Sequence, residues 1–297
     1  MSRLALSPRF LALALLCMAA PSLRAQINVR LEVQRHLFLC YEPIVATVSI
    51  TNMTGRDLTL EDKEPNKWFS FEILNSEDMP IPPRATDYHL PPLTIPSGQT
   101  VKRKLNLVNL YPVTDYGVYH VRAAIYVAAM DKYFPSQGIA VEVSEGKTLW
   151  QQTVGIPDGQ KDAGKSRTYE LLSFRQPKDN MLYVRIQDHD AGVVYGTYAL
   201  GRLINGYDPE AQVDAQSQVH IIQMVAPKEY LYSHFGPDGE MLNQQDYADL
   251  KTRPSLRRTP DGRVAVAGGV LVEPRTAQTA VATGPKLSDR PPGMPVP

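Results

Sequence analysis

The chain has 297 residues, of which 43% are hydrophobic and 21% are charged, with 31 basic residues matching 31 acidic ones. This composition supports a packed core and excludes wholesale disorder, and the length suits about two domains of ordinary size. The 25 prolines and 15 tyrosines favour a turn-rich β protein over a helical one.

Residues 1–25 have the features of a secretory signal peptide. Arg3 and Arg9 form a basic start, residues 10–20 are apolar but too few to span a bilayer as a helix, and Ala25 suits cleavage.

Cleavage removes three arginines and no acid, so 31 basic residues less three leave 28 against 31 acids. A mildly acidic chain without a long basic run argues against nucleic acid or an anionic membrane as a partner. We therefore expect a secreted or periplasmic protein without a transmembrane segment.

The two cysteines are expected to have different roles. Cys17 lies in the signal segment and raises the alternative of lipidation, although Leu16 precedes it where a small residue is expected. Cys40 is then the one cysteine of the mature chain, so an internal disulfide is excluded and stability must come from core packing.

Residues 26–146 show short apolar-polar alternations separated by turn signals. Val29, Leu31 and Val33 alternate with Arg30 and Glu32, which is the pattern of a strand with one buried face. Residues 80–96 are rich in proline and are expected to be a loop. About seven strands are predicted, near residues 27–33, 42–52, 58–60, 68–74, 101–107, 117–127 and 139–143.

Asp115, Gly117 and Tyr119 stand just before and at the start of one of these strands. Their arrangement resembles the tyrosine corner of immunoglobulin-like sandwiches, in which the tyrosine hydroxyl bonds back to the preceding loop. We therefore expect these three residues to have a structural role.

Three segments together carry a family resemblance. They are Glu42-Pro-Ile with Ile50-Thr-Asn52, Pro96-Ser-Gly-Gln-Thr-Val101, and Gly117 with Tyr119. Residues 27–145 thereby resemble bacterial immunoglobulin-like β-sandwich modules of the macroglobulin or BsuPI type. The resemblance implies a binding, spacer or scaffold module, and a protease-inhibitor-like module is an alternative.

Residues 147–166 are expected to be a linker or exposed loop, with residues 147–154 either closing the first domain or opening the second. Residues 167–272 are predicted to form a second antiparallel β domain. Gly236-Pro-Asp-Gly239 and Thr259-Pro-Asp-Gly262 are hairpin signals. Residues 243–253 suggest a short helix, and residues 196–204 fit either a strand or a helix. The proline-rich residues 273–297 are expected to be a disordered tail.

The candidates for chemistry are few. Asp188 and Asp190 have a spacing that offers oxygens to a cation, but Asp-x-Asp-x-Gly also suits an ordinary turn. His220 and His234 are expected to be structural or surface histidines, and Cys40 a packed thiol. No catalytic residue is identified, no cofactor is expected, and the chain is expected not to be an enzyme.

Tyrosines crowd the second domain. Most are expected in half-buried cross-strand pairs, while Tyr195, Tyr198, Tyr230 and Tyr232 are the candidates for an exposed recognition face. The sequence therefore predicts an all-β, secreted bacterial binding or scaffolding protein whose partner is a protein or glycan surface. The alternative is an extracytoplasmic hydrolase whose site is assembled from distant residues.

Overall fold

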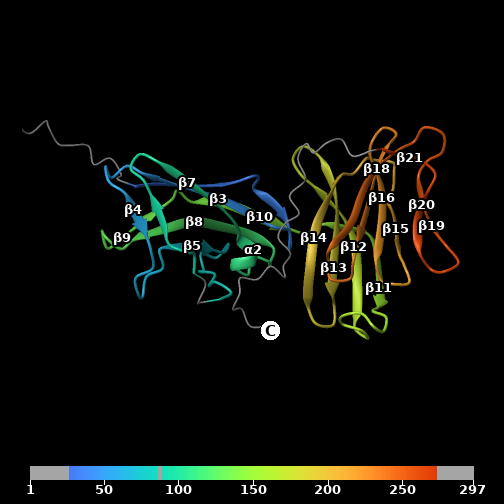
Figure 1. The fold of residues 1–297 in the computed structure, drawn as a ribbon, viewed down its shortest axis with the longest axis horizontal. Coiled ribbons are helices and arrows are strands. Elements are labelled where there is room, and N and C mark those ends of the chain that lie inside the picture. Colours follow the sequence, from blue (N-terminus) through green and yellow to red (C-terminus); the bar gives the residue numbers. More distant parts are fainter. Residues whose placement is uncertain (1–26, 86–88, 273–297) are drawn as a thin grey trace, which may run out of the picture.

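The computed structural model of the chain describes residues 27–85 and 89–272 (Figure 1). Within these ranges the chain is nearly all β, with mainly antiparallel sheets and one short helix, which confirms the predicted all-β class. No helix in this part of the chain is long and apolar enough to cross a membrane. The expected signal peptide and C-terminal tail lie outside the described residues.

The first domain has two sheets that share one hydrophobic core. Their strand orders are β1-β3-β7 and β2-β10-β8-β5, with β9 paired to β8 and a separate β4–β6 ladder. The bounds are β1 (Ile27–Val33), β2 (Leu37–Leu39), β3 (Val45–Asn52), β4 (Leu58–Leu60), β5 (Phe69–Leu74), β6 (Leu93–Ile95), β7 (Thr100–Asn106), α2 (Leu107–Leu110), β8 (Gly117–Val127), β9 (Lys132–Pro135) and β10 (Ile139–Ser144).

The alternation in the sequence explains why the two sheets face each other. Ala46, Val48 and Ile50 of β3 are fully buried, and so are Val121 and Ile125 of β8 in the other sheet. The intervening residues of the outer strands point to solvent. Period-two hydrophobicity thus determines which face of each sheet closes the core.

Tyr119 has the contact expected of a corner tyrosine. Its ring is buried in the core, and its hydroxyl donates a hydrogen bond of 2.9 Å to the carbonyl oxygen of Asp115. Gly117 has a φ of +144°, a backbone conformation that side chains disfavour. The corner therefore fixes the entry of the chain into β8, the longest strand of this domain.

The second domain has two larger sheets and a hairpin. The strand orders are β11-β12-β13-β14 and β15-β16-β17-β18-β21, with β19 paired to β20. The bounds are β11 (Lys147–Gly155), β12 (Ser166–Arg175), β13 (Asn180–Asp188), β14 (Val193–Arg202), β15 (Glu210–Val213), β16 (Val219–Ala226), β17 (Glu229–Phe235), β18 (Met241–Ala248), β19 (Ser255–Arg258), β20 (Val264–Ala267) and β21 (Val270–Val272).

These elements form successive layers, which Figure 1 shows from the first domain to the β19–β20 hairpin at the far end. One cluster, which includes Tyr169 and Phe235, fills the space between the two sheets. The outer face of the first sheet packs on Leu37 and Leu39 of the first domain. The outer face of the second sheet packs on Leu256 and Val264 of the hairpin. The central strands β12, β13, β16 and β17 of the second domain are therefore covered on both faces.

The same cross-strand pattern occurs in both sheets. In the first, Leu172 faces Tyr183 and Glu170 faces Arg185. In the second, Ile222 faces Tyr232 and His220 faces His234 at the corresponding places. In each sheet a polar cross-strand pair thus lies two residues along the ladder from an apolar pair.

Some expectations for this domain are corrected by the structure. The segment from Asn243, expected to be a helix, is instead strand β18, because its ladder with β17 outweighs the local preference of a polar segment. Residues 147–155 are strand β11 of the second domain, and the loop lies between β11 and β12. The ambiguous residues 196–204 fall mostly in β14.

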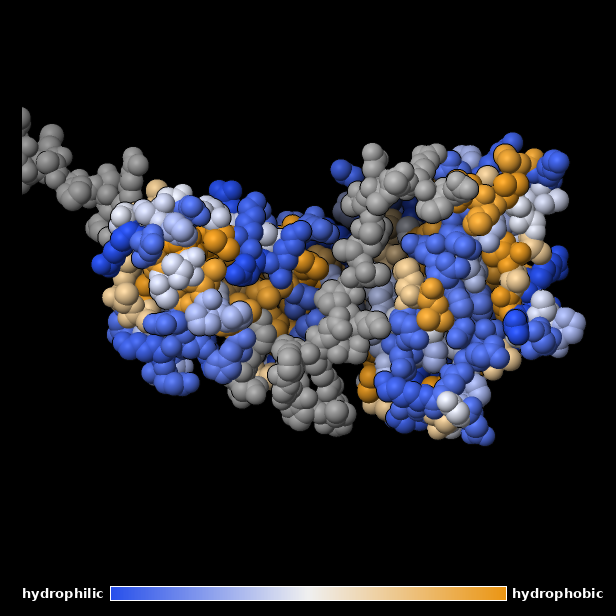
Figure 2. Space-filling model, viewed as in Figure 1, coloured by the Kyte–Doolittle hydropathy of each residue, from blue (hydrophilic) through white to orange (hydrophobic). Residues whose placement is uncertain are grey.

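On the face in Figure 2, apolar residues gather near the edge strand β21, where Val270, Leu271 and Val272 are exposed.

We predict that Tyr119→Phe lowers the free energy of unfolding by about 0.5–1.5 kcal/mol, because the ring stays in the core while the bond to Asp115 is lost. Urea unfolding of the whole chain measures this. Tyr116→Phe, at a side chain that is 60% exposed, is the matched control and should leave the midpoint unchanged. An unchanged midpoint for Tyr119→Phe would contradict a corner role.

Candidate functional site

Tyr230 and Tyr232 do not form an exposed recognition face. Their exposed fractions are 2% and 6%, and both rings pack against Leu256 and Val264. The physical reason is the β19–β20 hairpin, which covers the face of the sheet from which these rings project. The expectation of a binding role for these two tyrosines is therefore wrong.

Tyr195 and Tyr198 are half-buried and have a different setting. The guanidinium of Arg167 lies 3.9 Å from the centre of the Tyr195 ring, and Tyr198 stacks on Phe235 with ring centres 5.3 Å apart. Both tyrosines also line a narrow groove between the two domains, whose accessible volume of about 10 Å³ holds roughly one water molecule. The first domain contributes Tyr41, Pro43, Asn106, Val108 and Asn109 to this groove.

Asp188 and Asp190 do not converge on a common cation position. Asp188 is buried, accepts a hydrogen bond from the Ala191 backbone nitrogen and lies 3.5 Å from Arg167. Asp190 is exposed and accepts a hydrogen bond of 2.8 Å from the hydroxyl of Ser166. The turn interpretation of this pair therefore agrees with the contacts that both side chains make.

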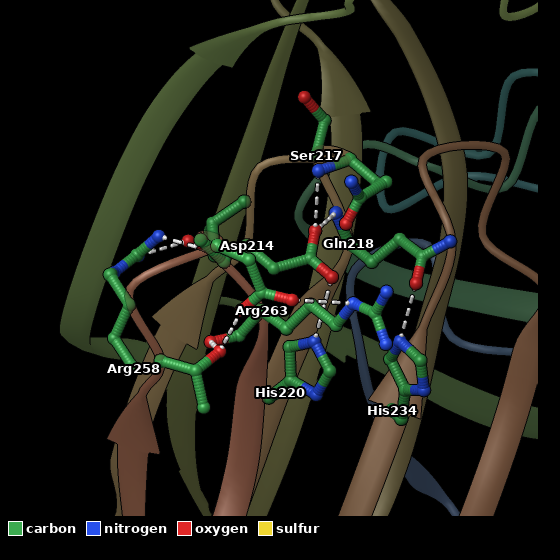
Figure 3. Close-up of polar contacts among 12 residues, drawn as sticks. Asp214, Ser217, Gln218, His220, His234, Arg258 and Arg263 are labelled. Atoms are coloured by element: carbon green, nitrogen blue, oxygen red, sulfur yellow. Dashed lines mark hydrogen bonds and ion pairs between the residues drawn. The ribbon is translucent and has the colours of Figure 1, made fainter.

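A different group of potential metal ligands converges in the second domain (Figure 3). Asp214 follows β15, His220 lies on β16 and His234 lies on β17, where the two histidines are direct cross-strand partners. One potential ligand atom from each of the three residues lies within 4.8 Å of the others. The two imidazole rings are stacked, with centres 4.1 Å apart and planes at 17°.

Hydrogen bonds fix each member of this histidine cluster. Nε2 of His220 is 3.1 Å from Oδ2 of Asp214, and its Nδ1 is 2.7 Å from the hydroxyl of Tyr232. Oδ1 of Asp214 accepts bonds of 2.9 Å from the backbone nitrogens of Gln216 and Gln218. Nε2 of His234 is 2.8 Å from Oε1 of Gln218.

Burial keeps the histidines uncharged. Desolvation lowers the pKa of His220, although Asp214 opposes this shift. The pKa of His234 is lowered to about 4, mainly by desolvation and to a smaller extent by the neighbouring His220. Both imidazoles are therefore neutral at neutral pH, and each has a lone pair on one ring nitrogen.

The sequence contains a signal for this cluster that spacing rules do not detect. His220 and His234 are separated by a hairpin, and a turn at Pro227 and Lys228 places them opposite each other. Metal motifs are usually sought at short spacing on one element, whereas this pair depends on the register of two strands.

Cys40 is a packed thiol. It is buried, its sulfur donates to the carbonyl oxygen of Thr114 over 2.7 Å, and burial raises its pKa to about 11. The thiolate is the nucleophilic form, so this setting disfavours a role as a catalytic nucleophile.

Polar contacts and an apolar cluster join the two domains. Arg35 forms an ion pair with Glu42, and its Nη1 donates to the hydroxyl of Tyr183 over 3.1 Å. Nη2 of Arg185 donates to the carbonyl oxygen of Cys40 over 2.8 Å. The apolar cluster combines Leu37 and Leu39 with second-domain residues Leu172, Phe174, Met181, Tyr183 and Ala199. We call these contacts the junction seam.

Comparisons with known proteins do not place the chain in a family. No protein-family model and no curated protein matches the sequence. Among solved structures, the chain is similar to Spo0M, a sporulation control protein from Bacillus subtilis, at 8% identity and a TM-score of 0.27. The similarity covers 60% of this chain and 91% of Spo0M, and a likeness of this size carries no argument about fold or function.

We predict that His234 makes stability depend on pH between about 6.5 and 4. Its pKa is about 4 in the folded chain and near 6.5 when unfolded, so the unfolded state binds the extra proton and stability falls as pH drops through this window. After discounting for partial exposure, His234→Gln should reduce the loss between pH 7 and pH 5 by about 1 kcal/mol. Urea unfolding in the presence of a chelator measures this loss. His189→Gln at an exposed hairpin is the control, and equal effects of the two variants would contradict the assignment.

We also predict that Cys40 reacts with a thiol reagent only when the chain is unfolded, because its sulfur is buried and its pKa is raised. Labelling in buffer and in concentrated urea, followed by intact-mass measurement, distinguishes the two states. Rapid labelling of the native chain would contradict the packed-thiol assignment.

Proposed function

We propose that the chain is a secreted or periplasmic bacterial binding protein in which two β domains, the first of immunoglobulin-like type, are held rigidly to present a groove to a protein or glycan. The observation that carries this proposal is the junction seam. A seam of this kind turns two modules into one binding surface, whereas modules on a flexible linker present two independent surfaces.

The chemistry of the seam supports a fixed arrangement. The side chain of Glu42 is 8% exposed, accepts from the backbone nitrogen of Leu39 and pairs with Arg35. Arg35 in turn contacts Tyr183, whose ring lies in the apolar cluster. Charge-assisted bonds at the edge of an apolar contact impose one geometry, because a shift of either domain breaks the bonds from Arg35 to Tyr183 and from Arg185 to the carbonyl oxygen of Cys40.

The groove has the composition of a recognition surface. Tyr41 and Tyr195 supply rings, and Asn109 supplies an amide. Among the described residues, the Tyr41 hydroxyl and the amide nitrogen of Asn109 have no protein partner, so both are available to a ligand. Tyrosine provides a large contact area with few torsions to fix, and asparagine supplies adaptable hydrogen bonds. This combination suits the polar groups and sugar faces of a glycan as well as a peptide backbone.

The rigidity of the junction is directly measurable. Spin labels at Lys104→Cys and Asn243→Cys, both exposed and on different domains, should give one narrow distance distribution by pulsed electron paramagnetic resonance. Glu42→Gln should broaden it, since Arg35 then loses its ionic partner. A broad distribution in the chain with native Glu42 would overturn the rigid arrangement on which the proposal rests.

Binding itself is tested with the double variant Tyr41→Phe/Asn109→Ala. Affinity electrophoresis against a panel of soluble polysaccharides, and titration with any peptide identified from co-secreted proteins, should show at least about fivefold weaker binding than the native chain. Gln151→Ala, at an exposed position on β11 outside the groove, is the matched control. Equal weakening by the control, or none by the double variant, would place the binding surface elsewhere.

A further inference from the structure

We propose that Asp214, His220 and His234 form a binding site for a divalent first-row transition-metal ion, for which Zn²⁺ is the best-suited probe. Two imidazole nitrogens and one carboxylate oxygen are ligands that zinc accepts, and these three lie within 4.8 Å of one another. Ligand atoms around a bound zinc lie roughly 3.3 Å apart, given metal-ligand bonds of about 2.0–2.1 Å. The cluster therefore needs a contraction of side chains and no movement of strands.

The positions of the three residues are fixed by secondary structure. His220 and His234 face each other across neighbouring strands, so both imidazoles project from the same face of the sheet. Asp214 closes the turn between β15 and β16, and its Oδ1 is held by two backbone nitrogens. This leaves Oδ2, the oxygen that faces His220, as the free ligand atom. Sites built on strands and tight turns hold their ligands more accurately than sites on loops.

The charge of the cluster favours a cation. The Asp214 side chain is 6% exposed, and among residues 27–85 and 89–272 no lysine or arginine comes within 4.0 Å of its carboxylate. Its hydrogen-bond partner is the His220 imidazole, whose side chain is 5% exposed. The carboxylate thus has no cationic side chain at contact distance, and the nearby Arg258 is bonded to the carbonyl oxygen of Val213. A divalent ion would bring a positive charge into direct contact with the buried carboxylate.

Tyr232 has the position of an outer-shell residue. Its hydroxyl lies 2.7 Å from Nδ1 of His220, the nitrogen that points away from Asp214. When Nε2 binds a metal, the imidazole keeps its single proton on Nδ1, from which it donates to the Tyr232 hydroxyl. The ring stays neutral, and the change is a shift of tautomer. Such outer-shell bonds orient a metal-binding histidine and raise its basicity.

One rearrangement must accompany binding. A metal lies in the plane of each imidazole that binds it, and the planes of the stacked rings are inclined by 17° with centres 4.1 Å apart. One ring must therefore rotate, and His234 is the less buried of the two. This cost lowers the affinity relative to a preorganised site, so we expect dissociation constants in the micromolar range. Three protein ligands also leave a fourth position for water or for a group from a bound partner.

The experiment uses the full chain without a histidine tag, first stripped with chelator. Calorimetric titration with Zn²⁺ should give one ion per chain, and Co²⁺ should give visible d–d absorption typical of nitrogen and oxygen ligands. At ten- to hundredfold excess over the dissociation constant, Zn²⁺ should raise the melting temperature by about 3–6 °C.

Variants distinguish this site from adventitious binding. Asp214→Asn and His234→Gln should each weaken Zn²⁺ binding at least about tenfold, and Tyr232→Phe, which keeps the ring, should weaken it about tenfold through the outer shell. His189→Gln, at an exposed histidine, is the matched control and should bind as the native chain does. Circular dichroism in chelator checks that each variant folds.

Two outcomes would overturn the proposal. One is native affinity in both Asp214→Asn and His234→Gln, and the other is a dissociation constant for the native chain of about a millimolar or weaker. Because the two substitutions lie on different elements, a folding defect in one leaves the other to decide.

Discussion

The guanidinium of Arg167 holds together the end of the second domain at which loops from both sheets meet. It is fully buried and lies near three carboxylates, at 3.4 Å from Asp162, 3.5 Å from Asp188 and 3.8 Å from Asp238. Asp162 and Asp238 lie in connections between strands and Asp188 ends β13, so one buried charge contacts segments of both sheets. The ring of Tyr195 covers the same guanidinium, which links this ionic centre to the groove between the domains. Removal of the guanidinium would leave the buried carboxylate of Asp188 without its ion-pair partner, which is costly in a protein interior.

The two sheets of this domain show how one ladder serves two purposes. At corresponding cross-strand places the first sheet carries Glu170 with Arg185, and the second carries His220 with His234. Arg185 reaches out of its sheet to the carbonyl oxygen of Cys40 and joins the domains. The histidines remain within their sheet, next to Asp214, where both ring nitrogens of His220 and Nε2 of His234 have polar contacts. The polar cross-strand pair of the first sheet thus contributes to the interdomain contact, and that of the second belongs to the histidine cluster.

Much of the fold can be predicted from local sequence patterns, whereas the histidine cluster cannot. Alternation in β1 and β3 and the two Pro-Asp-Gly turns are local, so they predict strands and hairpins without knowledge of their neighbours. Tyr230 and Tyr232 show the limit of this reasoning. Their shared face is readable from their spacing, but whether that face meets water depends on the distant β19–β20 hairpin. Likewise, His220 meets His234 only because of a hairpin register that spacing motifs do not encode, and β18 is a strand because β17 offers it a partner.

The junction seam also determines whether the two domains can be separated into stable fragments. Leu39 belongs by sequence to the first domain, but it packs in one cluster with Leu172, Phe174 and Tyr183 of the second. A fragment beginning at β11 would therefore present these three side chains to water on one open sheet face. Exposed apolar sheet faces promote association between chains. The hydrophobic interior therefore continues across the domain boundary near residue 146, and the first domain shields an apolar sheet face of the second from water.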